Sequence, residues 1–316
     1  MQKLSLTFIC FIALFSQALT KLNTFAEFES ISENRFYLAW ELPIKSNDDH
    51  HSFNGNYHFS NEPNFTFDKL VSDRRNRLFI LQFDGKSRLE STSVGSAKSN
   101  NGIYKNLPIY WLGKQSVDES YSFILNLGKS VKKEKYLYGL MNYHDKNEEN
   151  LVFYKNAFSN SDRGEREDIV FWLGQLDYSP ALTFLKEIYD TESSTKLKEK
   201  IIFAFSLDES SERTSYLIQI AKTDRKRSLR KKAIFWLSNM AGKHIEHFFN
   251  EIIYSDEDID LKESAIFALY QREAKDDLVN IAETGKDIRL RKKAIFWLGQ
   301  LGGEEHLEFL EKILNK

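Results

Sequence analysis

The sequence has little cysteine and little proline: one cysteine, Cys10, and four prolines in 316 residues. Scarce proline favours long helices over the loop-rich connections of a β-sandwich. The formal net charge is −2, so the chain lacks the basic excess with which proteins bind the phosphates of nucleic acids. We therefore expect a helix-rich fold and no nucleic-acid partner.

The lone cysteine lies in a segment with the pattern of a secretory signal peptide, residues 1–18. Lys3 precedes an apolar run, and the small residues Ser16 and Ala18 suit cleavage after Ala18. A membrane anchor is the alternative, but the run is about six residues shorter than the ~18 that a span needs. Cleavage leaves a chain without a thiol, which excludes disulfides, cysteine catalysis and Cys-ligated zinc. We expect a periplasmic or secreted protein with no transmembrane segment after cleavage.

One string, LRKKAIFWL, occurs at residues 229–237 and again at residues 290–298. Related strings precede each copy, at a period of about thirty-two residues: EREDIVFWL at 165–173, LKEKIIFAF at 197–205 and LKESAIFAL at 261–269. Two fainter copies come earlier: NLPIYWLGK at 106–114 and KEKYLYGLMN at 133–142. About seven units at a period near thirty are typical of a solenoid of stacked repeats.

Each unit has the apolar spacing of two amphipathic helices. In the first helix Leu229, Ala233 and Leu237 fall on one face. The second helix has apolar residues at equivalent positions in three units: Phe184, Leu185, Ile188 and Tyr189; Ile245, Phe248, Phe249, Ile252 and Ile253; Phe309, Leu310, Ile313 and Leu314. A lone helical hairpin cannot bury both faces, so each unit must pack on the next. We predict an all-α solenoid of about seven helical hairpins over residues 106–316.

Residues 19–105 lack the repeat and mix alternating apolar residues with aromatics, as in RFYLAWELPI and RLFILQFDGK. Asp84 and Gly85 in FDGKSRLES are typical of a hairpin turn. We expect a small β-rich region that covers the first helical unit, because solenoids need an end cap and isolated two-stranded ribbons are only marginally stable.

The repeated string resembles HEAT-like repeats of the short bacterial type, which are also found in phycobilin lyases. Within LRKKAIFWLGQLGG, residues 290–303, the matching residues are Leu290, Arg291, Ala294, Leu298, Gly299 and Gly302. The chain is also similar to exported bacterial HEAT-repeat proteins that alternate FWLG and FALS units behind a short non-helical segment. The resemblance covers about two thirds of the chain, implies a solenoid of helix pairs and implies no particular activity.

The residue at the tryptophan position alternates in size along the units: Trp111, Gly139, Trp172, Ala204, Trp236, Ala268 and Trp297. In the HEAT-like pattern this position faces the neighbouring repeat. A large ring opposite a small residue keeps the packed volume roughly constant. We therefore interpret the tryptophans as packing residues.

The residue before the tryptophan position is aromatic in every unit, and we name this set the aromatic column: Tyr110, Tyr138, Phe171, Phe203, Phe235, Phe267 and Phe296. Four residues later stands a second, mostly amide set, the amide column: Lys114, Asn142, Gln175, Leu207, Asn239, Gln271 and Gln300. Side chains at i and i+4 share a helix face, so the two columns would run side by side. The family resemblance implies that they lie on the helix that lines the concave surface.

Two interpretations of the aromatic column stay open. The rings can thicken the core, because helices in such stacks are contacted on three sides. They can also form a binding surface, since aromatic faces and carboxamides suit the side chains and backbone of a peptide, or the rings and hydroxyls of a sugar. The sequence favours a non-enzymatic scaffold that binds a protein or peptide, with a glycan-binding module as the alternative.

Other clusters carry weaker signals. Asp48, Asp49, His50, His51 and His58 would ligate zinc only if they folded together, and adjacent strand residues point to opposite faces. We expect no metal there, and we expect His244 and His247 to be surface residues.

The basic runs at 224–232 and 289–293 are interpreted as solvated faces and inter-unit ion pairs. The sequence has no nucleophile elbow, phosphate-binding loop or zinc-protease motif. We therefore expect no cofactor and no enzymatic activity, since an enzyme would need an unrecognised site within residues 19–105.

Overall fold

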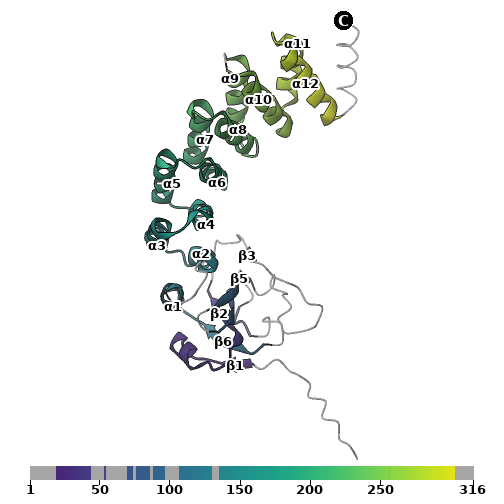
Figure 1. Cartoon of the computed structure of the whole chain (residues 1–316). Coiled ribbons are helices and arrows are strands. Elements are labelled where there is room, and N and C mark those ends of the chain that lie inside the picture. The colour runs from purple at the N-terminus through teal and green to yellow at the C-terminus, as the bar shows by residue number, and fades with distance from the viewer. Residues whose placement is uncertain are drawn as a thin grey trace, which may run out of the picture. The chain divides into compact units, whose positions relative to one another are not determined.

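The computed structural model describes residues 19–43, 53–54, 70–73, 76–85, 88–96, 107–129, 135–255 and 257–302. These residues belong to two compact units, which divide between Lys146 and Asn147. The first unit holds a sheet and two helices, and the second is a succession of helices (Figure 1). Residues 1–18 with the proposed cleavage site, and the histidines His50, His51 and His58, lie outside the described residues.

The sheet of the first unit has the strand order β1-β6-β2-β4-β5-β3. Its strands are β1 (Leu19–Lys21), β2 (Arg35–Leu42), β3 (Phe53–Asn54), β4 (Arg77–Asp84), β5 (Leu89–Ser96) and β6 (Ile109–Lys114). β2, β4 and β5 pair antiparallel, whereas β6 runs parallel to both β1 and β2. The β-rich N-terminal region expected from the sequence is thereby confirmed.

The Asp-Gly turn expected between two strands connects β4 to β5. Gly85 has a φ of +78°, a backbone conformation that residues with a Cβ adopt only with strain. The backbone N–H of Asp84 donates to the carbonyl of Arg88 at 2.9 Å, which closes the turn. The predicted hairpin is confirmed.

The prediction of a helical unit at residues 106–114 is wrong, because Ile109–Lys114 forms strand β6, which lies between β1 and β2 in the sheet. Tyr37 and Ala39 of β2 are the register partners of Ile109 and Trp111, so the pairing comes from a segment about seventy residues earlier in the chain. A local string cannot reveal such a distant partner. The β-rich part therefore extends beyond residue 105.

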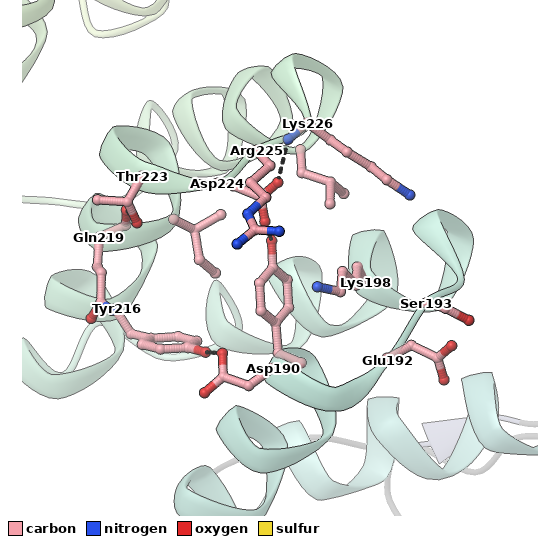
Figure 2. A pocket seen from close by; sticks show the side chains of 13 residues that line it. Asp190, Glu192, Ser193, Lys198, Tyr216, Gln219, Thr223, Asp224, Arg225 and Lys226 are labelled. Atoms are coloured by element: carbon pink, nitrogen blue, oxygen red, sulfur yellow. Dashed lines mark hydrogen bonds between the residues drawn. The ribbon is translucent and has the colours of Figure 1, made fainter.

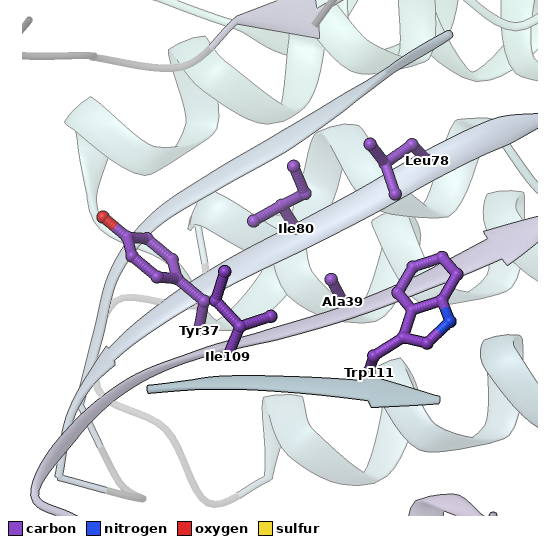
Figure 3. Packing of buried hydrophobic residues seen from close by; sticks show 6 residues of the cluster. All are labelled: Tyr37, Ala39, Leu78, Ile80, Ile109 and Trp111. Carbon is purple, nitrogen blue, oxygen red and sulfur yellow. The ribbon is translucent and has the colours of Figure 1, made fainter. Parts of the chain in front are cut away.

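Both faces of the sheet are apolar. Phe36, Trp40 and Phe83 lie on one face, where their rings contact Phe25 and Phe28 of the 3₁₀ helix η1 (Phe25–Ser30). The other face carries a separate buried cluster in which side chains from β2, β4 and β6 meet (Figure 3): Tyr37, Ala39, Leu78, Ile80, Ile109 and Trp111. The alternation of the two sets along each strand follows the period of two that a pleated strand imposes.

Two helices, α1 (Val117–Gly128) and α2 (Lys135–Asn142), complete the first unit. Residues 133–142 were expected to belong to the repeat array, and the segment is helical over α2. However, α2 contacts β5 and its neighbour α1, and the carbonyl of Tyr136 accepts a hydrogen bond from Thr92 on β5. α2 is therefore part of the sheet-containing unit.

The second unit alternates two sets of helices (Figure 1). Those of one set are α3 (Asn147–Asn160), α5 (Ser179–Thr191), α7 (Ser211–Thr223), α9 (Lys243–Tyr254) and α11 (Lys275–Thr284). Those of the other set are α4 (Arg163–Gly174), α6 (Thr195–Phe205), α8 (Arg227–Leu237), α10 (Ile259–Gln271) and α12 (Ile288–Leu301). The second set contains the five plain copies of the repeated string, so the expected helix-repeat pattern is present here.

Members of the second set contact one another in chain order, α4 with α6, α6 with α8, α8 with α10 and α10 with α12. We call this set the even-helix layer. Leu229, Ala233 and Leu237 of α8 are buried, as are Phe248 and Phe249 of α9. The apolar faces read from the sequence are thus the packed faces. The equivalent residues 309–314 lie outside the described part of the chain.

A repeated arginine ties three of the even helices to the helix before. The Nε atoms of Arg166, Arg230 and Arg291 donate to the carbonyls of Phe158, Ala221 and Ala282, at 3.0, 2.7 and 2.9 Å. Each carbonyl lies near the C-terminal end of the preceding helix, where backbone acceptors lack partners and a cation is favourable.

None of the described helices has the length and hydropathy that a membrane span requires.

Candidate functional site

Five of the seven aromatic-column residues lie on the even-helix layer at equivalent positions: Phe171, Phe203, Phe235, Phe267 and Phe296. The other two belong to the first unit. Tyr110 is buried on β6, and Tyr138 is buried on α2. The expectation that all seven form one column is wrong, because β6 is a strand and α2 packs on the sheet. Lys114 and Asn142 lie in the first unit for the same reason.

The structure divides the remaining rings between core and surface. Phe235 is 39 % exposed and Phe296 is 54 % exposed, whereas Phe171, Phe203 and Phe267 are half-buried. On α8, Phe235 lies on the side of the helix opposite the buried Leu229, Ala233 and Leu237. The helical period of 3.6 residues per turn places it there. The column is therefore neither a continuous core spine nor a continuous open surface.

Tryptophans of the next even helix cover two of the half-buried rings. Phe203 of α6 lies 4.7 Å from the ring of Trp236 on α8, and Phe267 of α10 lies 5.0 Å from Trp297 on α12. For Phe235 the residue at this position in the next even helix is Ala268, which has no ring to cover it. Phe171 is half-buried although the next even helix has Ala204 at this position, because its ring stacks on Phe203 at 6.2 Å. The size of the residue at the tryptophan position therefore accounts for the covering of Phe203 and Phe267 and not for that of Phe171.

The amide column is exposed at four positions: Gln175, Asn239, Gln271 and Gln300. Two of these amides already form hydrogen bonds within the protein. The Nδ2 of Asn239 donates to the carbonyl of Phe235 at 2.9 Å, and the amide of Gln271 lies 2.8 Å from the Ser238 hydroxyl. Leu207 interrupts the column on α6. The amides consequently contribute less free hydrogen-bonding capacity than their number suggests.

Lysines one turn before each exposed ring are a feature that the sequence analysis missed. Helices α8 and α12 each carry four Lys or Arg residues and no Asp or Glu. Lys231 is exposed at i−4 from Phe235, and Lys292 is exposed at i−4 from Phe296, so each lysine shares a helix face with its ring. The signal was present in the string RKKAIF itself, which places a lysine pair one turn before the phenylalanine.

Three of the four arginines of these two helices are paired with carboxylates of the neighbouring hairpin. Arg227 and Arg230 lie 2.9 and 2.6 Å from Asp258 and Glu257, and Arg289 pairs with Glu263. Lys293 approaches Glu263 at 3.7 Å. No carboxylate of the described chain pairs with Lys231, Lys232 or Lys292. The expected inter-unit pairing is confirmed for the arginines, and these three lysines remain for solvent or a ligand.

A polar cleft of about 510 Å³ opens between the hairpins α5–α6 and α7–α8 (Figure 2). The hydroxyl of Tyr189 donates to Asp224 at 2.7 Å, and the hydroxyl of Tyr216 donates to Asp190 at 3.2 Å. The Nζ of Lys198 lies 4.5 Å from the centre of the Tyr189 ring. The two hydrogen bonds cross from one hairpin to the next, whereas the contact of Lys198 with Tyr189 lies within the hairpin α5–α6.

The cleft tyrosines are held in the protonated form. Burial, followed by the hydrogen bond to Asp224, raises the pKa of Tyr189; burial, followed by the charge of Asp190, raises the pKa of Tyr216. Both phenols therefore act as hydrogen-bond donors that latch adjacent hairpins. They are not bases or nucleophiles near neutral pH.

A serine–histidine pair lies inside the first unit. The Oγ of Ser120 is 2.8 Å from Nε2 of His144, and Nδ1 of His144 is 2.8 Å from the carbonyl of Leu140. Because that carbonyl only accepts, Nδ1 carries the proton and Nε2 accepts from the serine. Trp40 Nε1 donates to the same hydroxyl at 2.8 Å, so the chain of hydrogen bonds joins β2, α1 and the end of α2.

This pair has the distance of a nucleophile and its base, but it lacks access to a substrate. Ser120 and His144 are 0 % and 1 % exposed. Burial lowers the pKa of His144 to about 4, so the imidazole is neutral at neutral pH. The geometry supports a structural role for the pair.

The histidines on α9 do not form a metal site with other residues of the described chain. His244 and His247 are exposed, and Nε2 of His247 lies 3.3 Å from Glu251. No group of three or more His, Cys, Asp or Glu side chains suited to a metal occurs among the residues that the structure describes.

A scan against models of known protein families found no match to the chain. A search of curated protein sequences found no match either.

Proposed function

We propose that this protein is an exported, non-enzymatic scaffold: an α-solenoid of HEAT-like hairpins. It binds a protein or peptide on the solvent-exposed face of its even-helix layer. The observation that carries the proposal is the exposure of Phe235 and Phe296 at equivalent positions of α8 and α12. Large exposed rings at regular spacing are typical of binding surfaces, where aromatic side chains act as anchors.

The packing of the second unit supports the solenoid part of the proposal. Each even helix contacts the next even helix, and each carries the same string at the same place. Nearest-neighbour stacking of equivalent units is the defining property of solenoids. In the proposed solenoid the even-helix layer would line the concave side, as the HEAT-like resemblance implies. The outward residues of this layer include both exposed rings.

The energetics favour a partner that covers the rings. Burying a phenylalanine side chain removes apolar area from water and contributes roughly 1.5–3 kcal/mol. Two such anchors contribute at most roughly 3–6 kcal/mol. Association costs about 4–15 kcal/mol in lost translational and rotational freedom, so the partner must add further contacts beside the rings. The half-buried Phe267 on α10 would form the floor between them.

A glycan is the second candidate ligand, because the exposed rings could stack on sugars and the amides could bond their hydroxyls. The hydrogen bonds of Asn239 to Phe235 and of Gln271 to Ser238 favour the peptide instead. They leave fewer free groups for the many hydroxyls of a sugar. Export to the periplasm or cell exterior, with cleavage after Ala18, rests on the pattern of residues 1–18.

Selection from a random phage-displayed peptide library tests the proposal. The purified chain serves as bait, and the double variant F235A/F296A serves as counter-bait. We expect peptides that are enriched on the wild type and lost on the variant, because both anchors are removed while the core is left intact. A glycan array probed with the same two proteins tests the alternative.

The variant is a valid control only if it folds. Both rings are exposed, so we expect F235A and F296A each to change the free energy of unfolding by less than about 1 kcal/mol, measured by urea titration. F205A is the matched comparison, because Phe205 is fully buried on α6 and its truncation should cost about 3–5 kcal/mol. Peptide enrichment that is equal on wild type and F235A/F296A would refute the proposed binding face.

A further inference from the structure

Helices α8 and α12 present the same cationic and aromatic pattern to solvent. On α8 the exposed face carries Lys231 and Phe235, with Lys232 beside them; on α12 it carries Lys292 and Phe296. None of these three lysines is neutralised by a carboxylate within the described chain. Each half of the face thus combines one apolar anchor with unpaired positive charge.

Helix α10 separates the two halves and differs from both. Asp260 and Glu263 of α10 are engaged by arginines of the flanking helices, Arg227 and Arg289. Its ring, Phe267, is half-buried against Trp297. In the centre of the face the acidic side chains are therefore neutralised by arginines, between two cationic patches.

The spacing of the two patches sets the length of a ligand that reaches both. Neighbouring packed helices lie about 8–10 Å apart, so α8 and α12 are separated by roughly 16–20 Å across α10. An extended chain advances about 3.3 Å per residue, and that distance corresponds to about six residues. Side chains six positions apart in a strand point to the same side, so both anchors could face the layer.

We infer that the partner is an extended acidic peptide segment, with two apolar anchors about six residues apart and carboxylates next to each anchor. This inference rests on the proposed function and names the chemistry of its partner. The anchors cover Phe235 and Phe296, and the carboxylates pair with Lys231, Lys232 and Lys292.

A uniform polyanion fits this face less well than such a peptide. Single-stranded nucleic acids and polyuronates carry charge at every unit, and their central charges would lie over α10, where the carboxylates already pair with the flanking arginines. A peptide can place its acidic residues at both ends and neutral residues over α10. Discrete patches favour a ligand with discrete charge.

The test is a titration of the full mature chain with fluorescein-labelled EEFGSGSGFEE, followed by fluorescence anisotropy. The comparison peptides are QQFGSGSGFQQ, which lacks the charge, and EEAGSGSGAEE, which lacks the anchors. We expect the acidic two-anchor peptide to bind at least about tenfold more tightly than either, with an affinity that falls as salt increases. Oligothymidylate and polygalacturonate serve as polyanion competitors.

Charge-reversal variants locate the binding. The variant K231E/K232E/K292E should weaken binding of the acidic peptide at least about tenfold. The matched control K243E/K275E/K286E makes the same change in net charge with exposed lysines outside the even helices, and it should leave the affinity within about twofold.

The outcomes separate this inference from the proposed function. Equal affinity for the neutral and acidic peptides, tighter binding of either polyanion, or equal losses in the two charge-reversal variants would overturn the acidic-peptide assignment. So would no binding of EEFGSGSGFEE. In each case the library selection with F235A/F296A still decides whether the face binds a peptide at all.

Discussion

Adjacent phenylalanine and tryptophan residues in the repeated string have different surroundings because about 100° of helical rotation separates them. Phe235 lies on the solvent side of α8, while Trp236 turns toward the neighbouring helix and contacts Phe203 at 4.7 Å. The pair therefore joins a packing residue to an exposed one. The structure confirms that the tryptophans of α8 and α12 pack on neighbouring repeats, and it adds that they cover Phe203 and Phe267.

The buried His144 should make the stability of the folded protein depend on pH. Burial lowers its pKa from 6.5 to about 4 in the folded protein, with smaller contributions from Arg77 and Lys146. The unfolded chain binds a proton below about pH 6.5 and the folded chain does not, so stability is complete above that value and falls as the pH decreases toward 4. We expect His144 to account for a loss of about 2 kcal/mol between pH 7.5 and pH 5, measured by urea unfolding.

The contribution of His144 is isolated by comparing variants. H144Q should flatten the pH dependence of the free energy of unfolding between pH 7.5 and pH 5, because it removes the titrating ring from the hydrogen-bond chain with Ser120. H247Q removes an exposed ring on α9 and should leave the dependence unchanged. An identical pH profile in the wild type and H144Q would contradict the argument.

Among the contacts between helices, α4 and α6 approach each other closely at Gly174. A Cβ built on Gly174 would lie 2.7 Å from the Cβ of Ala204 and 3.0 Å from its backbone, well inside van der Waals contact. The glycine of FWLG and the alanine of FAF therefore meet at the point where two even helices pack. The small residue at the tryptophan position is what permits this approach.

The two glycines of α4 give a matched test. G164A adds a methyl group at the start of the helix, where the nearest other atom is Asp162 Oδ1 at 3.4 Å, and should stabilise by up to about 1 kcal/mol. G174A gains the same helix propensity but overpacks the contact with Ala204, so we expect a net loss of about 1–3 kcal/mol. Thermal and urea unfolding of both variants check the signs. Equal stabilisation by the two substitutions would show that α4 and α6 are not closely packed.

At the scale of the whole molecule, the chain consists of a sheet-containing unit up to Lys146 and a helical unit from Asn147. Stability in a stack of repeats is a sum of unit terms and nearest-neighbour terms. A destabilising substitution in one helix should therefore loosen its neighbours first and distant elements least.

Hydrogen exchange measured by mass spectrometry checks this expectation. L237A truncates a fully buried residue of α8 and L81A truncates one of β4. We expect L237A to speed amide exchange in α6, α8 and α10 while the strands β2, β4 and β6 keep their protection, and L81A to do the reverse. Loss of protection across both units in either variant would show that they unfold as one.

The helix pairs were predictable because their information is local. The apolar spacing of Leu229, Ala233 and Leu237 needs only the helical period, and Asp84-Gly85 needs only turn chemistry. Strand β6 was not predictable from NLPIYWLGK, since its neighbours β1 and β2 lie far away in the sequence. The exposure of Phe235 depends on Ala268 and that of Phe203 on Trp236, each in the next hairpin. No helical wheel drawn for one helix contains that neighbour.

The sequence by itself determined the repeated helices, the hairpin turn and the low net charge, because each depends on residues that are close along the chain. Tertiary structure decided that residues 109–114 complete a sheet, that Ser120 and His144 meet in a closed interior, and that two of the column's rings reach solvent beside unpaired lysines. Those outcomes depend on which distant surfaces cover a side chain, and burial is a property of the packed assembly of elements.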